Sequence, residues 1–233
     1  MSKGAVAGMT GRFQGFTPDA TQFFTELAAN QDRIWFNDNK TRYERAVKAP
    51  MAALIEDVAE ELARRSIPLT GDAKRGLFRI HRDVRFSKDK APYKTHAGAV
   101  LTRDGRKNTL GLLYIHLDPT GSFAAAGFYH ADPSQLSRLR DSIAYGAKEF
   151  LALETRLQSA GLEFSREESL TRLPRGYDIA AGTPVEWAVK LRNLVVHRPI
   201  ADAALRSPAL VGDIADFAAD IMPLLDYGWD ALS

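Results

Sequence analysis

The chain has 233 residues, of which 45% are hydrophobic and 26% are charged, values that are ordinary for a globular protein. It contains no Cys, which excludes disulfides, thiolate metal sites and cysteine nucleophiles. Its formal net charge is only +2. No apolar run approaches the roughly 20 residues of a membrane span, so we expect a cytoplasmic protein without membrane contact.

The first helices are predicted from start signals and apolar spacing. Residues 1–15 are rich in Gly and Ala and lack the apolar core of a signal peptide, so we expect a flexible N-terminal tail. A single α+β domain should occupy residues 16–233. Thr17 and Pro18 are typical of a helix start, and this first helix should end near Asn30. Further helix is expected from Ile34 to about Arg65.

The stretch Lys74–His96 concentrates the positive charge of the chain. It holds eight Lys or Arg and two Asp, a net charge of +6 that leaves −4 for the rest of the sequence. Apolar and polar residues alternate over residues 78–86, which predicts a half-buried β-strand with a polar face. Residues 87–94 should then form a loop, because they contain an Asp-Lys pair and a proline.

A basic patch on a mildly acidic body attracts anions, and Arg offers bidentate geometry to carboxylate or phosphate. We therefore expect a site for a small phosphate- or carboxylate-bearing ligand. The candidate ligand-binding residues are Arg79, His81, Arg82, Asp83, Arg85, Ser87, Lys90, Tyr93, Lys94, Arg175 and Tyr177. The last two belong to an irregular section, residues 170–183, whose loop could line the same cleft.

Four more strands are predicted, over residues 96–103, 109–117, 121–130 and 194–200. Short turns join the first three, which favours antiparallel pairing. Leu112, Tyr114 and His116 should share one face of their strand, and Phe128 and His130 one face of the next. Helices should begin near Asp132 and residue 147, and a last helix should follow residues 207–208. The expected fold is α+β: an antiparallel sheet of about five strands with helices mainly on one face.

The chemistry of the site stays open at this stage. The five His residues lie in separate predicted strands without metal-ligand spacing, so no metal site is expected. No nucleotide-binding loop occurs, and the cofactor is not predicted. Acid–base catalysis by His81 and Asp83 is one possibility. The charged run could instead be an internal salt-bridge network of a structural or interaction module. Nucleic-acid binding ranks third, since the body is net negative. The oligomeric state is not predicted.

Several motifs follow one another in a distinctive order. They are Trp35-Phe36, Asn39-Lys40, Arg42-Tyr43, the run RIHRDVRFSKDKAPYKTH, Gly127–His130, LPRGYD and Glu186-Trp187. In this order they resemble a largely bacterial family, domain of unknown function 2461 (DUF2461), from about residue 16 onward. The resemblance implies a single-domain arrangement and an intracellular bacterial setting. It carries over no catalytic residue, cofactor or substrate.

Overall fold

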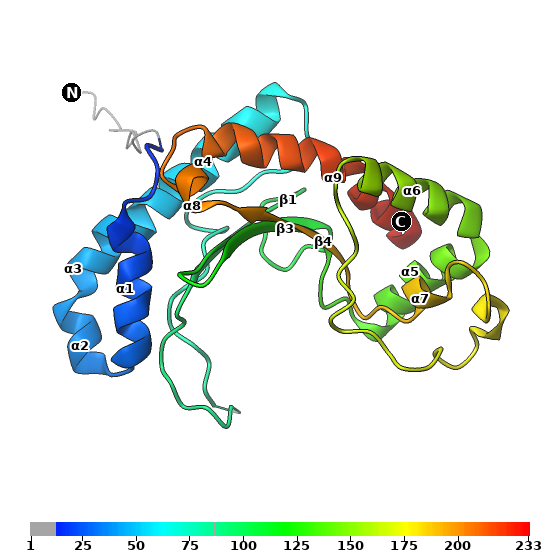
Figure 1. Cartoon of the computed structure of the whole chain (residues 1–233), viewed down its shortest axis with the longest axis horizontal. Helices are drawn as coiled ribbons and strands as arrows, with labels where there is room; N and C mark the ends of the chain where they lie inside the picture. Colours follow the sequence, from blue (N-terminus) through cyan, green and yellow to red (C-terminus); the bar gives the residue numbers. More distant parts are fainter. Residues whose placement is uncertain (1–12, 86) are drawn as a thin grey trace, which may run out of the picture.

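The computed structural model describes residues 13–85 and 87–233. Within these residues, four strands form one antiparallel sheet in the order β1-β2-β3-β4. The strands are β1 (Ala97–Thr102), β2 (Leu112–Leu117), β3 (Ser122–Phe128) and β4 (Leu194–Ile200). Figure 1 shows two long helices over one face of this sheet. The opposite face, which we call the open face, is not covered by these helices and lies between two groups of shorter helices. The predicted α+β class is confirmed.

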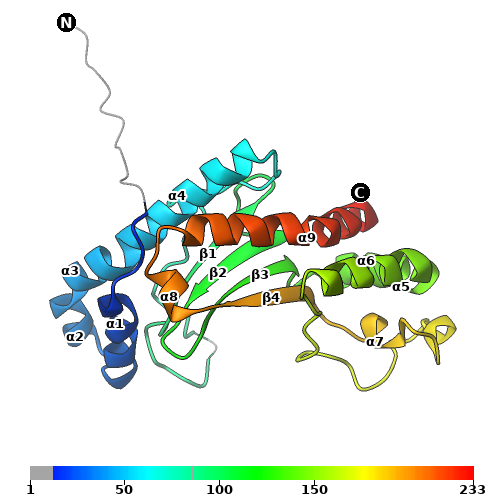
Figure 2. The same cartoon turned by 45° about the horizontal axis from the view of Figure 1, so that its top comes forward.

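The helices surround the sheet on three sides (Figure 2). Before β1 the chain forms α1 (Pro18–Ala29), α2 (Arg33–Asp38), α3 (Lys40–Tyr43), a π-helical segment (Glu44–Lys48) and α4 (Ala49–Arg64). Between β3 and β4 it forms α5 (Pro133–Tyr145), α6 (Ala147–Ser159), a 3-10 turn (Asp178–Ala180) and α7 (Glu186–Val189). After β4 come α8 (Asp202–Leu205) and α9 (Leu210–Leu232). The two long helices over the sheet are α4 and α9.

The core lies between the sheet and these two long helices. Strand side chains alternate between the two faces of a sheet, and the set that faces the helices is apolar and buried. It comprises Ala97, Ala99, Leu101, Leu113, Ile115, Leu117, Ala124, Ala126, Phe128, Leu194 and Val196. Helix α9 supplies matching apolar residues every third or fourth position, among them Ile214, Phe217 and Ile221. This packing leaves the other face of the sheet free to carry a site.

Residues 78–85, the described part of the stretch 78–86, do not form the strand that its alternation predicts. Isolated bridges, Leu77 to Ala99 and His81 to Tyr93, hold this part of the chain together with scattered backbone hydrogen bonds, such as that from the Phe78 N–H to the Gly98 carbonyl at 2.9 Å. Residues 78–85 and 87–95 instead make an irregular arm that extends below the sheet (Figure 1). The alternation is nevertheless real, because Ile80 is buried between two exposed neighbours. Alternating polarity reflects which side of the chain faces the core. A β-strand also needs a neighbouring strand with which to form a continuous series of backbone hydrogen bonds, and the alternation does not supply one. The sheet of the described residues therefore has four strands.

One further expectation differs from the structure at the end of a strand. Strand β3 ends at Phe128, which is fully buried, whereas His130 is exposed with a φ of 54°. A left-handed residue leaves the strand path, so these two side chains do not share a face.

Residues 1–12 of the predicted tail lie outside the described part of the chain. Phe13 is buried, and its N–H donates to Asp57 at 2.6 Å. No helix of the described residues has the length and apolarity that crossing a membrane requires.

Arg42 ties the N-terminal helices together. Its guanidinium donates to the Asp19 carboxylate at 2.7 Å and to both Glu26 oxygens at 2.5 and 3.1 Å. Only 22% of the Arg42 side chain is exposed, against 76% for Arg45, which also pairs with Asp19. Partly buried bidentate pairs stabilise more than exposed ones. We expect Arg42→Met to lower the free energy of unfolding by about 2 kcal/mol, as measured by urea denaturation.

Arg45→Met is the matched control, and it should change the free energy of unfolding by less than about 0.5 kcal/mol. Equal effects of the two substitutions would show that the bidentate geometry at Arg42 contributes nothing beyond a surface ion pair.

Candidate functional site

The open face of the sheet carries a hollow whose floor is set by strand register. Val100, Tyr114, Ala125 and His197 are opposite one another across β1 to β4. The neighbouring row contains Gly98, His116 and Phe123. Small residues stand beside large aromatic ones in both rows, which leaves space above the sheet. Because a Cβ at position 98 would lie 2.5 Å from the Tyr114 hydroxyl oxygen, only glycine lets the Tyr114 ring lie over β1.

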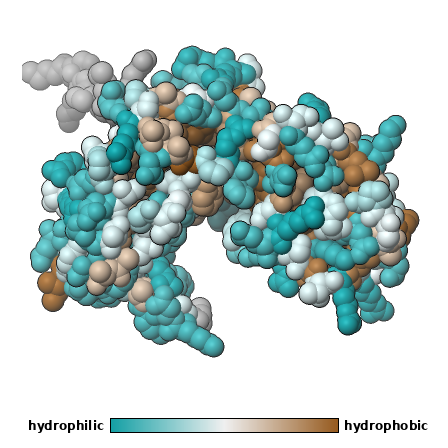
Figure 3. All heavy atoms as spheres, in the orientation of Figure 1, coloured by the Kyte–Doolittle hydropathy of each residue, from teal (hydrophilic) through white to brown (hydrophobic). Residues whose placement is uncertain are grey.

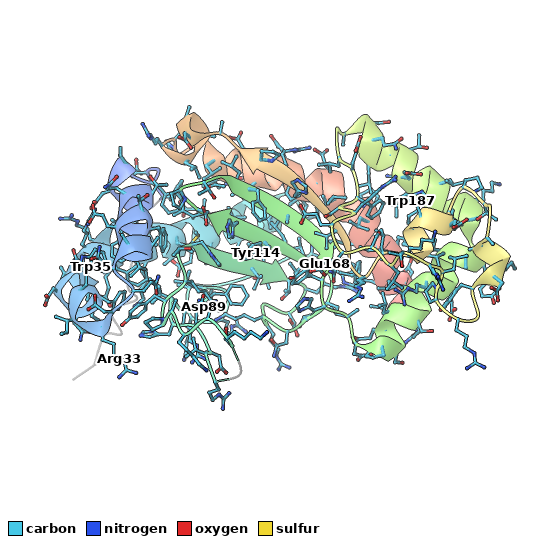
Figure 4. The ribbon with its side chains drawn as sticks, turned by 60° about the horizontal axis from the view of Figure 1, so that its bottom comes forward. Arg33, Trp35, Asp89, Tyr114, Glu168 and Trp187 are labelled. Carbon is cyan, nitrogen blue, oxygen red and sulfur yellow. The ribbon has the colours of Figure 1, made fainter. Side chains whose placement is uncertain are left out.

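A cavity of about 570 Å³ occupies this hollow, which is within the usual size of small-molecule sites. Figure 3 shows the molecule hollowed on this side, between the α1–α3 helices and the α5–α7 helices. Figure 4 looks onto the open face, with Tyr114 over the middle of the sheet and Glu168 on the loop at one edge. The aromatic rings in the wall are Phe78, Tyr114, Phe123 and Tyr129. A flat apolar body would therefore meet ring faces in this cavity.

One end of the cavity is basic. The Lys94 and Lys107 ammonium nitrogens lie 5.1 and 5.3 Å from the centroid of the Phe78 ring. Burial lowers the pKa of Lys94, and the nearby charges of Arg79 and Lys107 lower it further. Among the described residues, no carboxylate forms an ion pair with Lys94 or Lys107. A half-buried ammonium group therefore faces the cavity with its charge uncompensated.

A second polar group lies beside Lys94, where β1 begins and β2 ends. Pairing of Ala97 with Leu117 brings the residues just beyond them, His96 and Asp118, next to His116. The His96 and His116 ring centroids are 4.5 Å apart, and His116 stacks on Phe123 at the same distance. The His116 Nε2 atom lies 3.7 Å from Asp118 Oδ2. These three side chains are half-buried, and both imidazoles line the cavity.

The two imidazoles are held in the neutral form. Burial lowers the pKa of His116 to about 4, and the His96 ring adds to this effect although Asp118 opposes it. Burial also lowers the pKa of His96, with a further contribution from the Lys94 charge. The Tyr114 hydroxyl lies 2.9 Å from His116 Nδ1, and burial raises the pKa of Tyr114 to about 12. Near neutral pH the His116 ring can therefore act as a neutral donor or acceptor towards the cavity.

The opposite end of the cavity is acidic and comes from a different part of the chain. Ser165 pairs with β4, its N–H donating to the Val195 carbonyl at 2.8 Å, and the following residues 167–168 reach the cavity. Asn193 fixes this end, because its side-chain amide donates to Glu168 at 2.6 Å and accepts the His130 N–H at 2.8 Å. The cavity thus has a positive end, an aromatic middle and a negative end.

Of the eleven candidate residues predicted from the sequence, Lys94 lines the cavity. Two of the arginines are instead paired with aspartates of the arm, Arg82 with Asp89 at 2.5 Å and Arg85 with Asp83 at 2.7 Å. Lys90 donates to the Val84 carbonyl at 2.9 Å. Figure 4 shows Asp89 out on the arm, away from Tyr114. These contacts are of the kind expected for an internal salt-bridge network, and they are exposed.

The other candidates are also dispersed. Tyr93 is buried and stacks on Phe36 of α2, with ring centroids 4.3 Å apart, and His81 lies against the same two rings. The Ser87 N–H closes a turn of the arm. Arg79 is exposed but close enough to Lys94 to affect its pKa.

The two candidates from the loop before α7 do not line the cavity. The Tyr177 hydroxyl is buried against α5 and donates to Asp141 at 2.9 Å, whereas Arg175 is exposed. The predicted convergence of the arm and this loop on one cleft therefore does not occur among the described residues.

Most residues of the cavity wall were not predicted from the sequence. His96, His116, Phe123 and Glu168 were not among the candidates, although the shared face of Tyr114 and His116 was predicted and is confirmed by the pairing of β2. The polar residues in an otherwise apolar strand were the available signal. Their meeting with His96 depends on the β1–β2 register, which the nine residues between these strands do not determine.

The fold and site define an α+β protein with a ligand-sized cavity on the uncovered face of an antiparallel sheet. The family model of a conserved hypothetical protein, DUF2461, matches residues 19–227. The chain therefore belongs to the DUF2461 family, in agreement with the resemblance noted in its motifs. No curated protein and no solved structure matches it.

Proposed function

We propose that the protein binds a small organic anion, with a flat apolar body in the cavity and a carboxylate or phosphate group at Lys94. The observation that carries this proposal is the uncompensated, half-buried ammonium group of Lys94 at the end of an aromatic cavity. A charge in such a position is costly unless it has a partner. A bound anion would provide that partner and restore the ordinary pKa of the lysine.

The charges around Lys94 support an anion rather than a cation as its partner. Lys107 lies over the same Phe78 ring as Lys94, and Arg79 adds positive potential from the arm. Low-dielectric walls concentrate such a field and favour ligands of opposite sign. The neutral His116 ring and the Tyr114 hydroxyl add hydrogen-bonding groups close to the same end.

The opposite end limits the ligand further. Glu168 is held by Asn193 with a carboxylate oxygen bonded at 2.6 Å, and Glu167 also lines the cavity. A ligand that extends the full length of the cavity would be favoured if its far end carried hydrogen-bond donors. The aromatic wall between the two ends supplies apolar contact area without selecting a particular reaction.

Substitution of Lys94 tests the proposal. The probe is 2-naphthoate, with uncharged 2-naphthamide as its matched analogue, titrated calorimetrically in the presence of EDTA. We expect the native protein to bind the carboxylate at least about tenfold more tightly than the amide, and Lys94→Met to abolish that preference. A charge-assisted hydrogen bond contributes roughly 1.5–3 kcal/mol, which corresponds to about ten- to hundredfold in affinity.

Lys90→Met serves as the control, because Lys90 donates to the arm backbone and does not line the cavity. It should keep the preference for the carboxylate. The same preference in Lys94→Met, or no binding of 2-naphthoate and of phenyl phosphate by the native protein, would contradict the proposal.

A further inference from the structure

We propose that His96, His116 and Asp118 form a binding site for one first-row divalent transition metal ion, of which Zn²⁺ is the representative. The His residues of the chain lack the spacing of metal ligands that are close in sequence. Here the ligands come together through strand pairing, and their potential ligand atoms all lie within 4.8 Å of one another. Two imidazoles and one carboxylate are a ligand set that such ions accept.

The separations are close to those of a bound ion. Ligand atoms about 2.1 Å from one tetrahedral zinc ion lie about 3.4 Å apart. The His116 Nε2 and Asp118 Oδ2 atoms are 3.7 Å apart, too far for a hydrogen bond and near the separation that a shared ion imposes. The third ligand is the His96 ring, which lies against the His116 ring and has a ligand atom within 4.8 Å of the other two.

The neighbouring groups orient two of these ligands towards a common point. The Tyr114 hydroxyl occupies His116 Nδ1 at 2.9 Å, which leaves Nε2 for the ion. Thr120 donates both its backbone N–H and its hydroxyl to Asp118 Oδ1, at 2.8 and 2.6 Å, which leaves Oδ2 turned to His116. Such outer contacts fix the tautomer of a ligating histidine and the rotamer of a ligating carboxylate.

The site would be open rather than closed. Three protein ligands leave at least one position of the ion unfilled, as in catalytic rather than structural zinc sites. Both imidazoles line the cavity, so the unfilled position would face it. The Lys94 side chain lines the same cavity as the two imidazoles, and its positive charge opposes a cation there. Because of this repulsion, removal of the Lys94 charge should strengthen metal binding, whereas removal of a ligand should weaken it.

Metal binding is measured on the untagged full-length chain, stripped with EDTA and free of organic ligand. Zn²⁺ affinity comes from competition with a chromophoric chelator, and Co²⁺ absorption reports the coordination geometry. We expect one equivalent per chain, with affinity lowered at least about tenfold in His96→Gln, His116→Gln and Asp118→Asn. Tyr114→Phe and Thr120→Val should each weaken binding about tenfold, and Lys94→Met should tighten it.

His197→Gln is the matched control, because His197 lines the same cavity outside the cluster. Binding that is unchanged in His96→Gln and Asp118→Asn, or absent from the native chain, would overturn the proposal. A folding defect cannot imitate the expected pattern, since Lys94→Met must gain affinity. The result is also independent of the proposed anion binding, which is measured with EDTA present: either can fail while the other holds.

Discussion

Replacing Gly228 with alanine is expected to lower the free energy of unfolding by about 3 kcal/mol. Gly228 lies on the face of α9 that packs against the end of β3, where a Cβ would be 2.1 Å from a carbon of the Phe128 ring. Phe128 is fully buried, so its ring cannot swing aside without displacing other core residues. The clash must exceed the gain of up to about 1 kcal/mol that alanine brings to a helix interior.

The same helix offers the matched control. Gly212 also lies in α9, but a Cβ there has no atom within 4 Å. Gly212→Ala should therefore raise the free energy of unfolding by about 0.5–1 kcal/mol. Both variants are measured by urea denaturation monitored by circular dichroism. The double substitution Gly228→Ala with Phe128→Leu should recover part of the loss, because the shorter side chain makes room. A stabilising Gly228→Ala would mean that α9 lies farther from the sheet than the structure has it.

Filling the cavity should abolish ligand binding while the fold is kept. Ala125 lies in the middle of β3 between Tyr114 and His197, and its side chain lines the cavity. Ala125→Phe would place a ring where the apolar body of a ligand is expected. We expect the affinity for 2-naphthoate to fall at least about a hundredfold, since the ligand and the new ring compete for one volume. The melting temperature should be unchanged or raised, because the added ring covers apolar wall.

Ala181→Phe makes the same chemical change at an exposed position outside the cavity and should leave the affinity unaltered. Titration calorimetry measures binding, and differential scanning calorimetry confirms that each variant folds. Ala125→Phe that binds 2-naphthoate as tightly as the native chain would place the ligand elsewhere on the surface.

Local signals predicted the elements that depend on local contacts. Asp132 was expected to start a helix, and its carboxylate caps α5 by accepting the Gln135 N–H at 2.9 Å. Thr17 was expected at the start of α1 and lies at that position, although its side chain makes no capping bond. The alternation in β2 assigned Tyr114 and His116 to one face, and this assignment is confirmed. Each of these patterns is complete within a few residues.

The candidate site could be predicted only in part, because it depends on contacts between distant segments. Lys94 was a candidate because of its charge, and it does line the cavity. Two of the arginines that precede Lys94 in the sequence, Arg82 and Arg85, lie farther along the arm. They pair with aspartates of the arm itself. A high density of charge in the sequence therefore did not locate the cavity. The register of β1 against β2 did, and a register depends on contacts between segments rather than on a local pattern.

The stacking of Tyr93 on Phe36, at a centroid separation of 4.3 Å, links the selectivity of the cavity to helices that do not line it. Lys94 follows Tyr93 directly, so the position of its ammonium group depends on how firmly that ring is seated against α2. A substitution that loosens the packing among α1, α2 and α3 would therefore shift the charge in the cavity without altering any residue of its wall. Evolution could retune ligand choice through these N-terminal helices while the sheet and its face stay constant.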